Sequence, residues 1–135
     1  MGTVQPQSYS RVERRNAGAL RPVRILLLED DPDVRLMLTL ALRTEGYDVT
    51  PVTTADEALE SLSRRRHDLI LTDYWLPRKD GLQFLQEAQS RGVLAKAPVI
   101  LCSAFPPARV GNATVVAKPI ELDDLLGRIR RLLRR

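Results

Sequence analysis

Short apolar runs alternate along most of this sequence with stretches in which apolar residues recur every three or four positions. A continuous apolar run of four or five residues is typical of a strand buried on both faces, and the longer spacing is typical of an amphipathic helix. The predicted strands are residues 25–28, 48–52, 69–72, 99–102 and 114–117. The predicted helices are residues 32–45, 54–65, from after Gly81 to about Arg91, and 121–135.

This alternation restricts the fold, because parallel strands need crossover connections and those connections are almost always right-handed. Five strands separated by helices therefore predict an α/β fold with a doubly wound, five-stranded parallel sheet. The chain has 135 residues, which suits one domain of this kind.

The first 22 residues differ in composition from the rest. They contain four arginines, Arg11, Arg14, Arg15 and Arg21, against one acid, Glu13, and so carry +3 of the formal net charge of +4. With few apolar residues, this segment cannot offset the entropy of ordering. We expect residues 1–22 to be a flexible basic tail and residues 23–135 to form the domain. A tail that binds DNA or another anionic partner is the alternative, but no aromatic or groove-reading motif supports nucleic acid.

Composition excludes several other classes. The single cysteine, Cys102, cannot form an intramolecular disulfide or a Cys-x-x-Cys metal site. No apolar run approaches the roughly 20 residues of a membrane helix, and no apolar stretch follows the N-terminal arginines as it would in a signal peptide. No phosphate-binding GxxxxGK loop occurs. We therefore expect a cytoplasmic protein without a membrane segment or a nucleotide site.

Polar residues collect where the predicted strands end. These residues are Glu29, Asp30 and Asp31 after the first strand, Asp73 after the third, Ser103 after the fourth and Lys118 after the fifth. Because the carboxyl ends of neighbouring parallel strands lie about 4.8 Å apart, distant parts of the sequence should meet in one small cluster.

The residue types of this cluster indicate phosphoryl chemistry. Crowded carboxylates either shift their pKa values or hold a cation, and oxygen ligands without histidine or cysteine favour Mg²⁺. One carboxylate can then accept a phosphoryl group while the metal, a lysine and a hydroxyl neutralise its charge. Asp73 is the candidate, since it stands alone at its strand end. The alternative is that the acids only cap helices, as Asp31 before Pro32 could, but capping does not account for Ser103 or Lys118.

Four segments resemble the receiver domain of bacterial two-component response regulators: ILLLEDDPDVR, DLILTDYWLPRKDGLQFL, VILCSA and VVAKPI. The resemblance covers residues 24–135 and implies a flavodoxin-like sheet with strand order 2-1-3-4-5. It also implies that Mg²⁺ is held by Glu29, Asp30, Asp73 and the backbone carbonyl of Trp75, with the acidic pair acting directly or through water. Asp73 becomes the phosphoacceptor, Ser103 the switch hydroxyl and Lys118 its cationic partner. Asp31 is not expected to be a ligand, and the Lys118–Pro119 bond is expected to be cis.

The resemblance further implies a function and partners. The chain would take a phosphoryl group from a histidine kinase or histidine phosphotransfer protein and signal by protein contact, as a monomer or weak dimer. Its only chemistry would be Mg²⁺-dependent self-phosphorylation and self-dephosphorylation. Three alternatives stay open: a receiver excised from a longer regulator or hybrid kinase, a scaffold that is never phosphorylated, and a magnesium-dependent phosphatase. The phosphatase would need a general acid where Trp75 stands.

Two features depart from typical receivers. Val115 occupies the position of the aromatic switch residue, three before the lysine. The stretch from Ser103 to Lys118 is about two helical turns shorter than usual, and Pro106 and Pro107 disfavour a helix there. We expect the helix between the fourth and fifth strands to be vestigial. The surface that many receivers build from this helix, the fifth strand and the last helix is then not used in the usual way.

Two apolar pairs carry further hypotheses. Trp75 and Phe105 lie two residues after Asp73 and Ser103, where family members tune hydrolysis of the phosphoaspartate, so their bulk predicts a slow loss of phosphate. The alternative is that both rings only cover apolar surface. Leu36 and Leu40 lie one turn apart on the first helix, off its core stripe, and predict an exposed kinase-docking pair. The alternative is that they are ordinary exposed apolar residues.

Three smaller expectations remain. His67, just past a helix end, is expected to be a solvated cap, and Cys102 a small buried apolar residue. The last helix has its acids first and its arginines last, which suits the helix dipole. Its arginines, Arg128, Arg130, Arg131, Arg134 and Arg135, are expected to form a solvated face, with a basic output face as the alternative.

Overall fold

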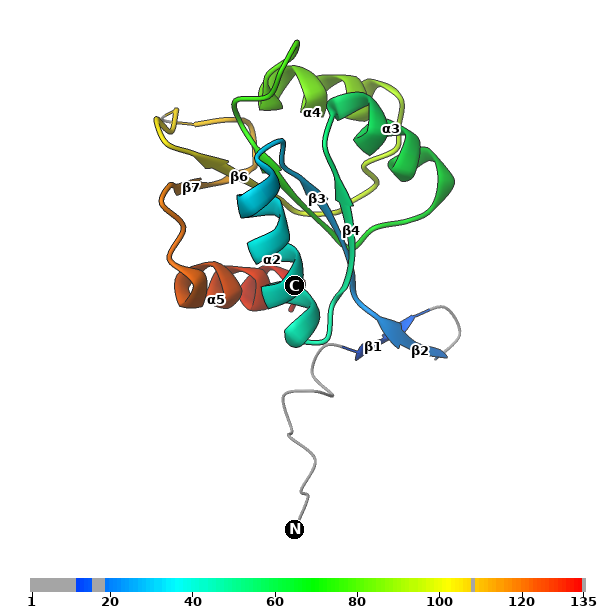
Figure 1. Cartoon of the computed structure of the whole chain (residues 1–135). Coiled ribbons are helices and arrows are strands. Elements are labelled where there is room, and N and C mark those ends of the chain that lie inside the picture. Colours follow the sequence, from blue (N-terminus) through cyan, green and yellow to red (C-terminus); the bar gives the residue numbers. More distant parts are fainter. Residues whose placement is uncertain (1–11, 16–18, 108, 135) are drawn as a thin grey trace.

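The computed structural model describes residues 12–15, 19–107 and 109–134 and has a five-stranded parallel sheet at its centre (Figure 1). Its strands are β3 (Arg24–Leu28), β4 (Asp48–Val52), β5 (Leu69–Asp73), β6 (Val99–Ser103) and β7 (Thr114–Ala117). They lie in the order β4-β3-β5-β6-β7. The predicted doubly wound fold and its strand order are confirmed.

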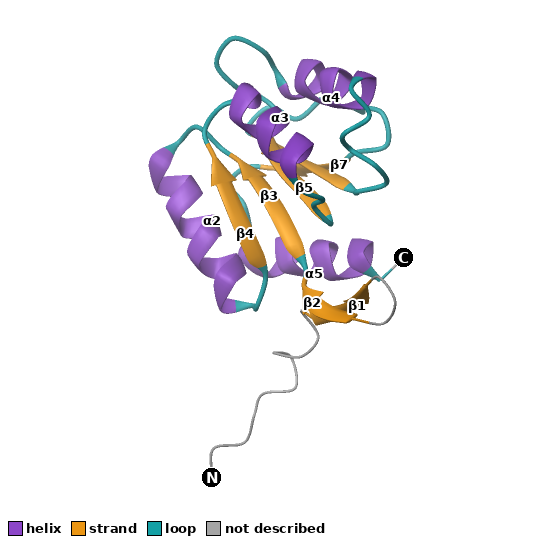
Figure 2. Cartoon of the chain, turned by 90° about the vertical axis from the view of Figure 1, so that its right-hand side faces the viewer, coloured by secondary structure: helices purple, strands orange, loops and turns teal. Residues whose placement is uncertain are grey.

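Helices cover both faces of the sheet (Figures 1 and 2). They are α2 (Pro32–Thr44), α3 (Ala55–Arg64), α4 (Gly81–Ser90) and α5 (Leu122–Leu133). Alternate residues of a strand point to opposite faces, so Ile25 and Leu27 pack into the core under α2 and α5. Leu26 and Leu28 pack into the second core, under α3 and α4. The central strands are apolar over most of their length because both of their faces are covered.

Side-chain caps fix where the helices begin. Asp31 Oδ1 accepts hydrogen bonds from the backbone N–H groups of Asp33 at 2.9 Å and Val34 at 3.2 Å, ahead of Pro32 in the first turn of α2. Thr54 and Asp80 form reciprocal capping boxes at the starts of α3 and α4. Asp31 is therefore the N-cap of α2, which is the role that the sequence analysis gave it as the alternative to a place in the site.

A two-stranded antiparallel hairpin precedes the sheet, formed by β1 (Val12–Arg15) and β2 (Ala19–Pro22). The sequence analysis did not predict these strands within the expected tail. Backbone pairing needs no apolar side chains, so composition gave no sign of the hairpin. Residues 1–11 and 16–18 lie outside the described residues. The flexibility of the tail and the boundary after residue 22 therefore stay predictions.

No helix connects β6 to β7 in residues 104–107 and 109–113, which form bends and turns. The predicted loss of this helix is confirmed for those residues. Beside the connection a groove of about 530 Å³ opens toward α4, lined by Leu82, Leu85 and Val110 among others.

His67 is buried, with only 3 % of its surface exposed, so the prediction of a solvated cap is wrong. Its Nε2 lies 3.4 Å from Ser61 Oγ, and burial lowers the pKa of the imidazole. Cys102 is buried as predicted, and burial raises the pKa of its thiol to about 12. Among the described residues, no helix has the length and apolar character needed to cross a membrane.

Candidate functional site

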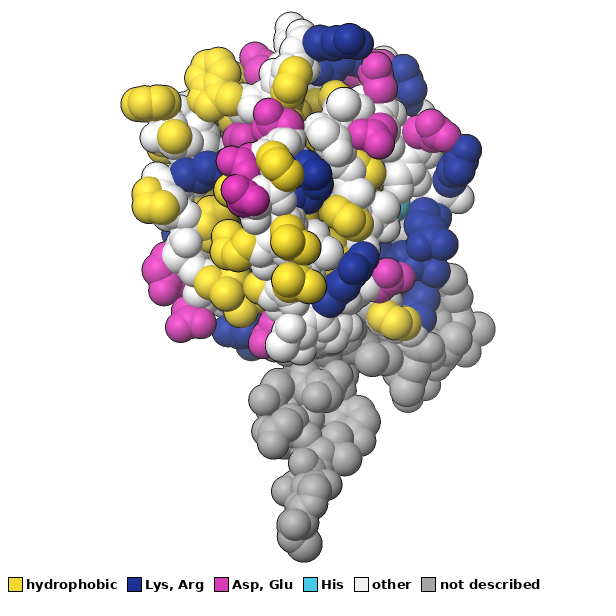
Figure 3. Space-filling model, viewed as in Figure 1, with side chains coloured by type: hydrophobic (Ala, Val, Ile, Leu, Met, Phe, Trp, Pro, Cys, Tyr) yellow, Lys and Arg dark blue, Asp and Glu magenta, His cyan; other side chains and the backbone are white. Residues whose placement is uncertain are grey.

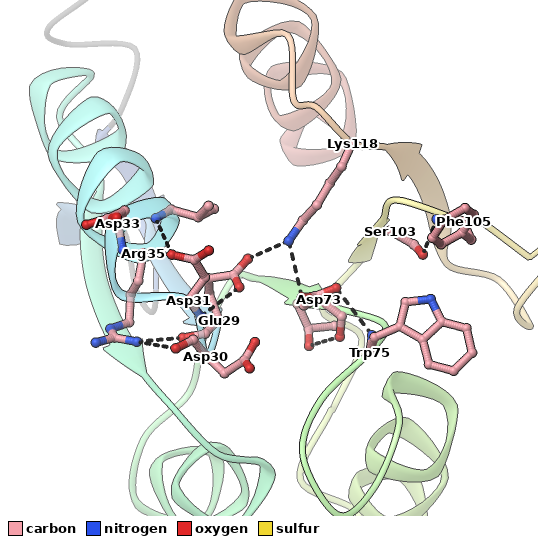
Figure 4. Close-up of polar contacts among 12 residues, drawn as sticks. Glu29, Asp30, Asp31, Asp33, Arg35, Asp73, Trp75, Ser103, Phe105 and Lys118 are labelled. Atoms are coloured by element: carbon pink, nitrogen blue, oxygen red, sulfur yellow. Dashed lines mark hydrogen bonds and ion pairs between the residues drawn. The ribbon is translucent and has the colours of Figure 1, made fainter.

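Three carboxylates meet at the carboxyl ends of β3 and β5, which are neighbours in the sheet (Figure 4). Leu28 pairs with Thr72, so the residues that follow them, Glu29 and Asp73, lie side by side. Glu29, Asp30 and Asp73 each offer a carboxylate oxygen, and these oxygens lie within 4.8 Å of one another. The convergence predicted from strand ends is thus present.

Lys118 connects two of these carboxylates. Its Nζ donates hydrogen bonds to Glu29 Oε1 at 3.0 Å and to Asp73 Oδ2 at 3.2 Å. Its backbone N–H donates to Ser103 O at 2.8 Å, and the Lys118–Pro119 bond is cis, as the resemblance implies. The lysine therefore approaches the cluster from the edge strand, opposite Asp30.

The electrostatics of the cluster reflect its burial. Burial is the main cause of the raised pKa of Glu29, and it outweighs the bond from Lys118. For Lys118, burial opposes the charged form, but the bonds to Glu29 and Asp73 together prevail and raise the pKa of its ammonium group. The site therefore holds a charged lysine against crowded carboxylates that still carry excess negative charge, and this charge suits a divalent cation.

Ser103 is fully buried at the end of β6, next to the strand that carries Asp73. Its Oγ accepts a hydrogen bond from the backbone N–H of Phe105 at 3.1 Å. A partly buried acid cluster, a lysine and a hydroxyl thus lie at the ends of β3, β5, β6 and β7.

Comparison with known proteins shows the family of this chain. The family described as "Response regulator receiver domain" has a model that matches residues 25–130. The chain belongs to the response regulator receiver domain family. Receiver domains are phosphoacceptors and bind Mg²⁺, and the acid cluster of this receiver fits that ion because it offers only oxygen ligands.

Curated relatives share about a third of their aligned residues with this receiver. It is 38 % identical over 120 residues to "Transcriptional regulatory protein BasR" of Escherichia coli (strain K12), covering 84 % of this chain and 53 % of that protein. It is 35 % identical over 119 residues to "Response regulator MprA" of Mycobacterium sp. (strain KMS), covering 84 % of this chain and 52 % of that protein. The chain spans about half the length of the curated relatives it matches.

Solved structures resemble this receiver over nearly their whole length. The receiver domain of the hybrid histidine kinase CckA has a TM-score of 0.74 and 33 % identity, covering 82 % of this chain and 98 % of that one. A CheY-like receiver domain protein from Methanospirillum hungatei JF-1 has a TM-score of 0.76 and 26 % identity, covering 83 % and 94 %. Each of these two proteins resembles this receiver in both fold and sequence.

Two backbone hydrogen bonds hold the loop after β5 beside the receiver site. Trp75 N–H donates to Asp73 Oδ1 at 3.2 Å, and Gly81 N–H donates to Tyr74 O at 2.6 Å. A Cβ on Gly81 would lie 2.7 Å from Leu101 Cδ2 and 3.2 Å from Asp73 O. Only glycine fits at this position, because the first residue of α4 packs against the backbone at the end of β5 with no room for a Cβ.

The two rings predicted to tune hydrolysis are exposed, Trp75 by 55 % and Phe105 by 79 %. Figure 4 shows the indole of Trp75 extending away from the carboxylate of Asp73. Tyr74 packs against the edge of that indole, with ring centroids 4.8 Å apart. The influence of the two rings on phosphate lifetime stays a prediction.

Two charged residues near the site were not anticipated. Arg35 Nη1 donates to the backbone carbonyls of Glu29 at 2.9 Å and Asp30 at 3.3 Å, and so holds the chain that carries both acids. Lys79, in the loop after Trp75, lies 2.6 Å from Glu87 Oε1 on α4. No regular sequence spacing predicts either contact. A long arginine or lysine side chain reaches an acceptor on another segment, and not one on the same face of its own helix.

Proposed function

We propose that Asp73 accepts a phosphoryl group from a histidine kinase or histidine phosphotransfer protein, and that the chain passes the resulting change on by protein contact. The observation that carries this proposal is the position of Lys118 Nζ, 3.2 Å from Asp73 Oδ2 and 3.0 Å from Glu29 Oε1 within one carboxylate cluster. Helix capping by the acids does not account for a lysine at this position. In a phosphoacceptor site, the lysine neutralises the charge of the phosphoryl group.

Mg²⁺ would be held by Glu29, Asp30, Asp73 and the backbone carbonyl of Trp75. The first three are supported by oxygens within 4.8 Å of one another, and the Trp75 carbonyl rests on the resemblance alone. When bound, the ion supplies positive charge that neutralises phosphoryl oxygens. Arg35 positions the two acids of the β3 end through their backbone carbonyls.

The transfer forms one bond and breaks another. A carboxylate oxygen of Asp73 bonds to phosphorus as the bond from phosphorus to the donor's imidazole nitrogen breaks, and that nitrogen keeps the electron pair and takes a proton. Lys118 already donates to Asp73 and would donate to a phosphoryl oxygen of the product. The Ser103 hydroxyl, which uses its oxygen to accept from Phe105, retains its hydrogen to donate to another phosphoryl oxygen.

Leu36 and Leu40 are proposed to dock the phosphodonor. They are 59 % and 56 % exposed on α2, one turn apart, and Met37 between them is 44 % exposed. Figure 3 shows apolar side chains gathered over α2 and over the surface between α2 and α5. An exposed apolar stripe beside an acidic site suits a partner helix that must bring its histidine to Asp73.

Trp75 and Phe105 are proposed to prolong the life of the phosphoaspartate by limiting the approach of water. This proposal is supported by their places two residues after Asp73 and Ser103, which end the adjacent strands β5 and β6. The loss of a helix between β6 and β7 supports a further proposal, that output does not use the surface which that helix would form. Cytoplasmic location, a monomer or weak dimer, and chemistry limited to self-phosphorylation and self-dephosphorylation complete the proposed function.

A receiver that serves a longer regulator or hybrid kinase is the second candidate. The observation in its favour is that the curated relatives are about twice the length of the matched region. The phosphoacceptor chemistry is the same in both cases, and the length of the native gene distinguishes them.

Intact-mass spectrometry after incubation with Mg²⁺ and acetyl phosphate tests the phosphoacceptor. We expect wild type to gain the mass of one phosphoryl group and Asp73→Asn to gain none, while Asp31→Asn, which alters only the helix cap, gains it normally. No gain in wild type, or an equal gain in Asp73→Asn, overturns the proposal. Circular dichroism of each variant shows that it is folded.

A further inference from the structure

A small hollow lies at the amino ends of β5 and β6, the opposite edge of the sheet from Asp73. It has a volume of about 180 Å³ and lies between residues 66–68, which lead into β5, and residues 96–98, which lead into β6. Leu132 and Leu133, at the end of α5, line it as well. No residue of this hollow belongs to the carboxylate cluster, so the proposed function leaves it unexplained.

The hollow is lined by a buried imidazole with an unsatisfied nitrogen. His67 is the only histidine in the chain and keeps 3 % of its surface exposed. Its Nε2 lies 3.4 Å from Ser61 Oγ, but its Nδ1 is buried and has no hydrogen-bond partner among the described residues. Buried polar atoms are nearly always hydrogen-bonded, so this nitrogen indicates a partner that is not part of the chain.

The chemistry of the ring indicates which kind of partner it needs. Burial lowers the pKa of His67, and the Arg65 backbone opposes this effect without reversing it, so the ring is neutral at pH 7. A neutral imidazole carries one proton. With the Ser61 hydroxyl donating to Nε2, that proton lies on Nδ1, which is then a donor without an acceptor. Such a donor suits an anion.

The charges around the hollow also suit an anion. Arg66 and Lys96 are exposed, line the hollow from two adjacent loops, and form no ion pair with any described residue. One acid, Asp68, lines it too, but Asp68 Oδ2 already accepts a hydrogen bond from the backbone N–H of Arg24 at 2.8 Å. A guanidinium, an ammonium and a ring N–H together offer donors to three oxygens. A phosphate group has that many oxygens and a charge close to −2, whereas a carboxylate has only two oxygens.

We propose that this hollow binds a phosphate group, either of the free ion or of a small monoester. Arg66 and Lys96 donate to two of its oxygens. His67 Nδ1–H donates to a third through one bridging water, because Nδ1 itself has no exposed surface. The apolar part of a monoester lies against the half-buried side chains of Leu132 and Leu133. Since five residues of β5 separate the hollow from the carboxylate cluster, the ligand does not compete for the phosphoacceptor.

NMR of the imidazole nitrogens tests this site directly, because the single histidine gives an unambiguous signal. We expect the free chain to show the proton on Nδ1. Titration with inorganic phosphate or phenyl phosphate, in EDTA and without Mg²⁺, should shift that signal saturably, with a dissociation constant of roughly 1 mM. Sodium chloride at the same ionic strength should not. Tighter binding of phenyl phosphate assigns the site to a monoester, and equal binding assigns it to the free ion.

Charge-removing variants test the two cations. Arg66→Gln and Lys96→Gln should each weaken phosphate binding by at least about tenfold. Arg64→Gln is the matched control, since Arg64 is exposed in the same segment, pairs with Glu60 at 2.5 Å and does not line the hollow.

Three results would overturn the proposal. They are a ring proton on Nε2, no saturable shift with either phosphate compound, and equal weakening by Arg64→Gln and Arg66→Gln, which would show bulk charge alone. None of these measurements involves Asp73 or Mg²⁺, so the proposed phosphoacceptor stands or falls independently.

Discussion

Lys118 and Glu29 lie 89 residues apart in the sequence, yet Lys118 Nζ donates a hydrogen bond to Glu29 Oε1 at 3.0 Å. Glu29 keeps only 2 % of its surface exposed at this contact. The pair joins the first and last strands of the βα alternation, and its electrostatics lead to the first prediction.

Glu29→Gln should gain stability relative to wild type as pH rises. Burial raises the pKa of Glu29 above its ordinary value of 4.5, so the folded state holds the proton more tightly than the unfolded chain does. The resulting stability is complete below pH 4.5 and is lost as pH rises through the raised pKa. Glutamine has no proton to lose. Urea unfolding with EDTA, from about pH 4 to about pH 7, measures the difference in free energy of unfolding. The free energy of unfolding of Glu29→Gln minus that of wild type should rise with pH. If this difference falls or stays constant, the pKa of Glu29 is not raised in the folded state.

Asp30→Asn should weaken Mg²⁺ binding by at least about tenfold, because loss of an outer partner alone commonly costs about 10–100-fold. Titration with Mg²⁺, followed by the fluorescence of Trp75, gives the dissociation constant. Trp75 is the only tryptophan in the chain and donates to Asp73, so its signal is local. Asp33→Asn is the matched control, since Asp33 lies one turn away and outside the cluster. Equal weakening in both variants would indicate bulk charge and not ligation.

Gly81→Ala should destabilise the fold by about 1–3 kcal/mol, the usual cost of overpacking a core. Its new methyl group would lie 2.7 Å from Leu101 Cδ2 and 3.0 Å from the Cα of Tyr74. Urea unfolding measures the loss. Gly127→Ala in α5 is the control and should instead stabilise by about 0.5–1 kcal/mol. A Cβ at Gly127 would meet only the far ends of the Arg130 and Arg131 side chains, at 3.9 and 3.5 Å. If the two variants lose the same stability, the close packing at Gly81 is not the cause.

Trp75→Asn should shorten the lifetime of the phosphoaspartate, because a smaller polar side chain admits water and can orient it. Decay of the phosphorylated mass after removal of acetyl phosphate gives the rate. Met37→Asn, an exposed apolar residue on α2, should leave the rate unchanged. An unchanged rate in Trp75→Asn would show that the indole only covers surface.

Leu36→Ala with Leu40→Ala should slow phosphotransfer from a histidine phosphotransfer protein by about tenfold or more and leave labelling by acetyl phosphate unchanged. Loss of two apolar anchors lowers affinity for a protein, whereas a small donor makes no contact with them. Leu82→Ala is the control, as Leu82 is 37 % exposed on α4, across the sheet. Equal rates from the protein donor in all three chains would remove α2 from the docking surface.

The sequence predicts those site residues whose place follows from their position at the end of a parallel strand. Asp73 and Lys118 come at the ends of apolar strands, and ligands of doubly wound sheets gather at those strand ends, so the sequence alone places both residues in the cluster. The absence of a helix after Ser103 likewise follows from Pro106 and Pro107 in a short connection.

Features set by contacts through space were not predictable in this way. His67 sits past a helix end, where solvent exposure is usual, but neighbouring segments enclose it. Arg35 reaches two carbonyls whose geometry depends on the finished loop. The β1–β2 hairpin depends on backbone pairing, which apolar patterning does not report.

The order of the strands has a consequence for synthesis. Among the described residues β7 pairs only with β6, and Lys118 follows it, so the ammonium group reaches the carboxylates after every other residue of the site has been synthesised. A nascent chain that ends before β7 presents acids without their counter-charge. Under the proposed function, the competence of Asp73 to accept a phosphoryl group is therefore acquired late in translation.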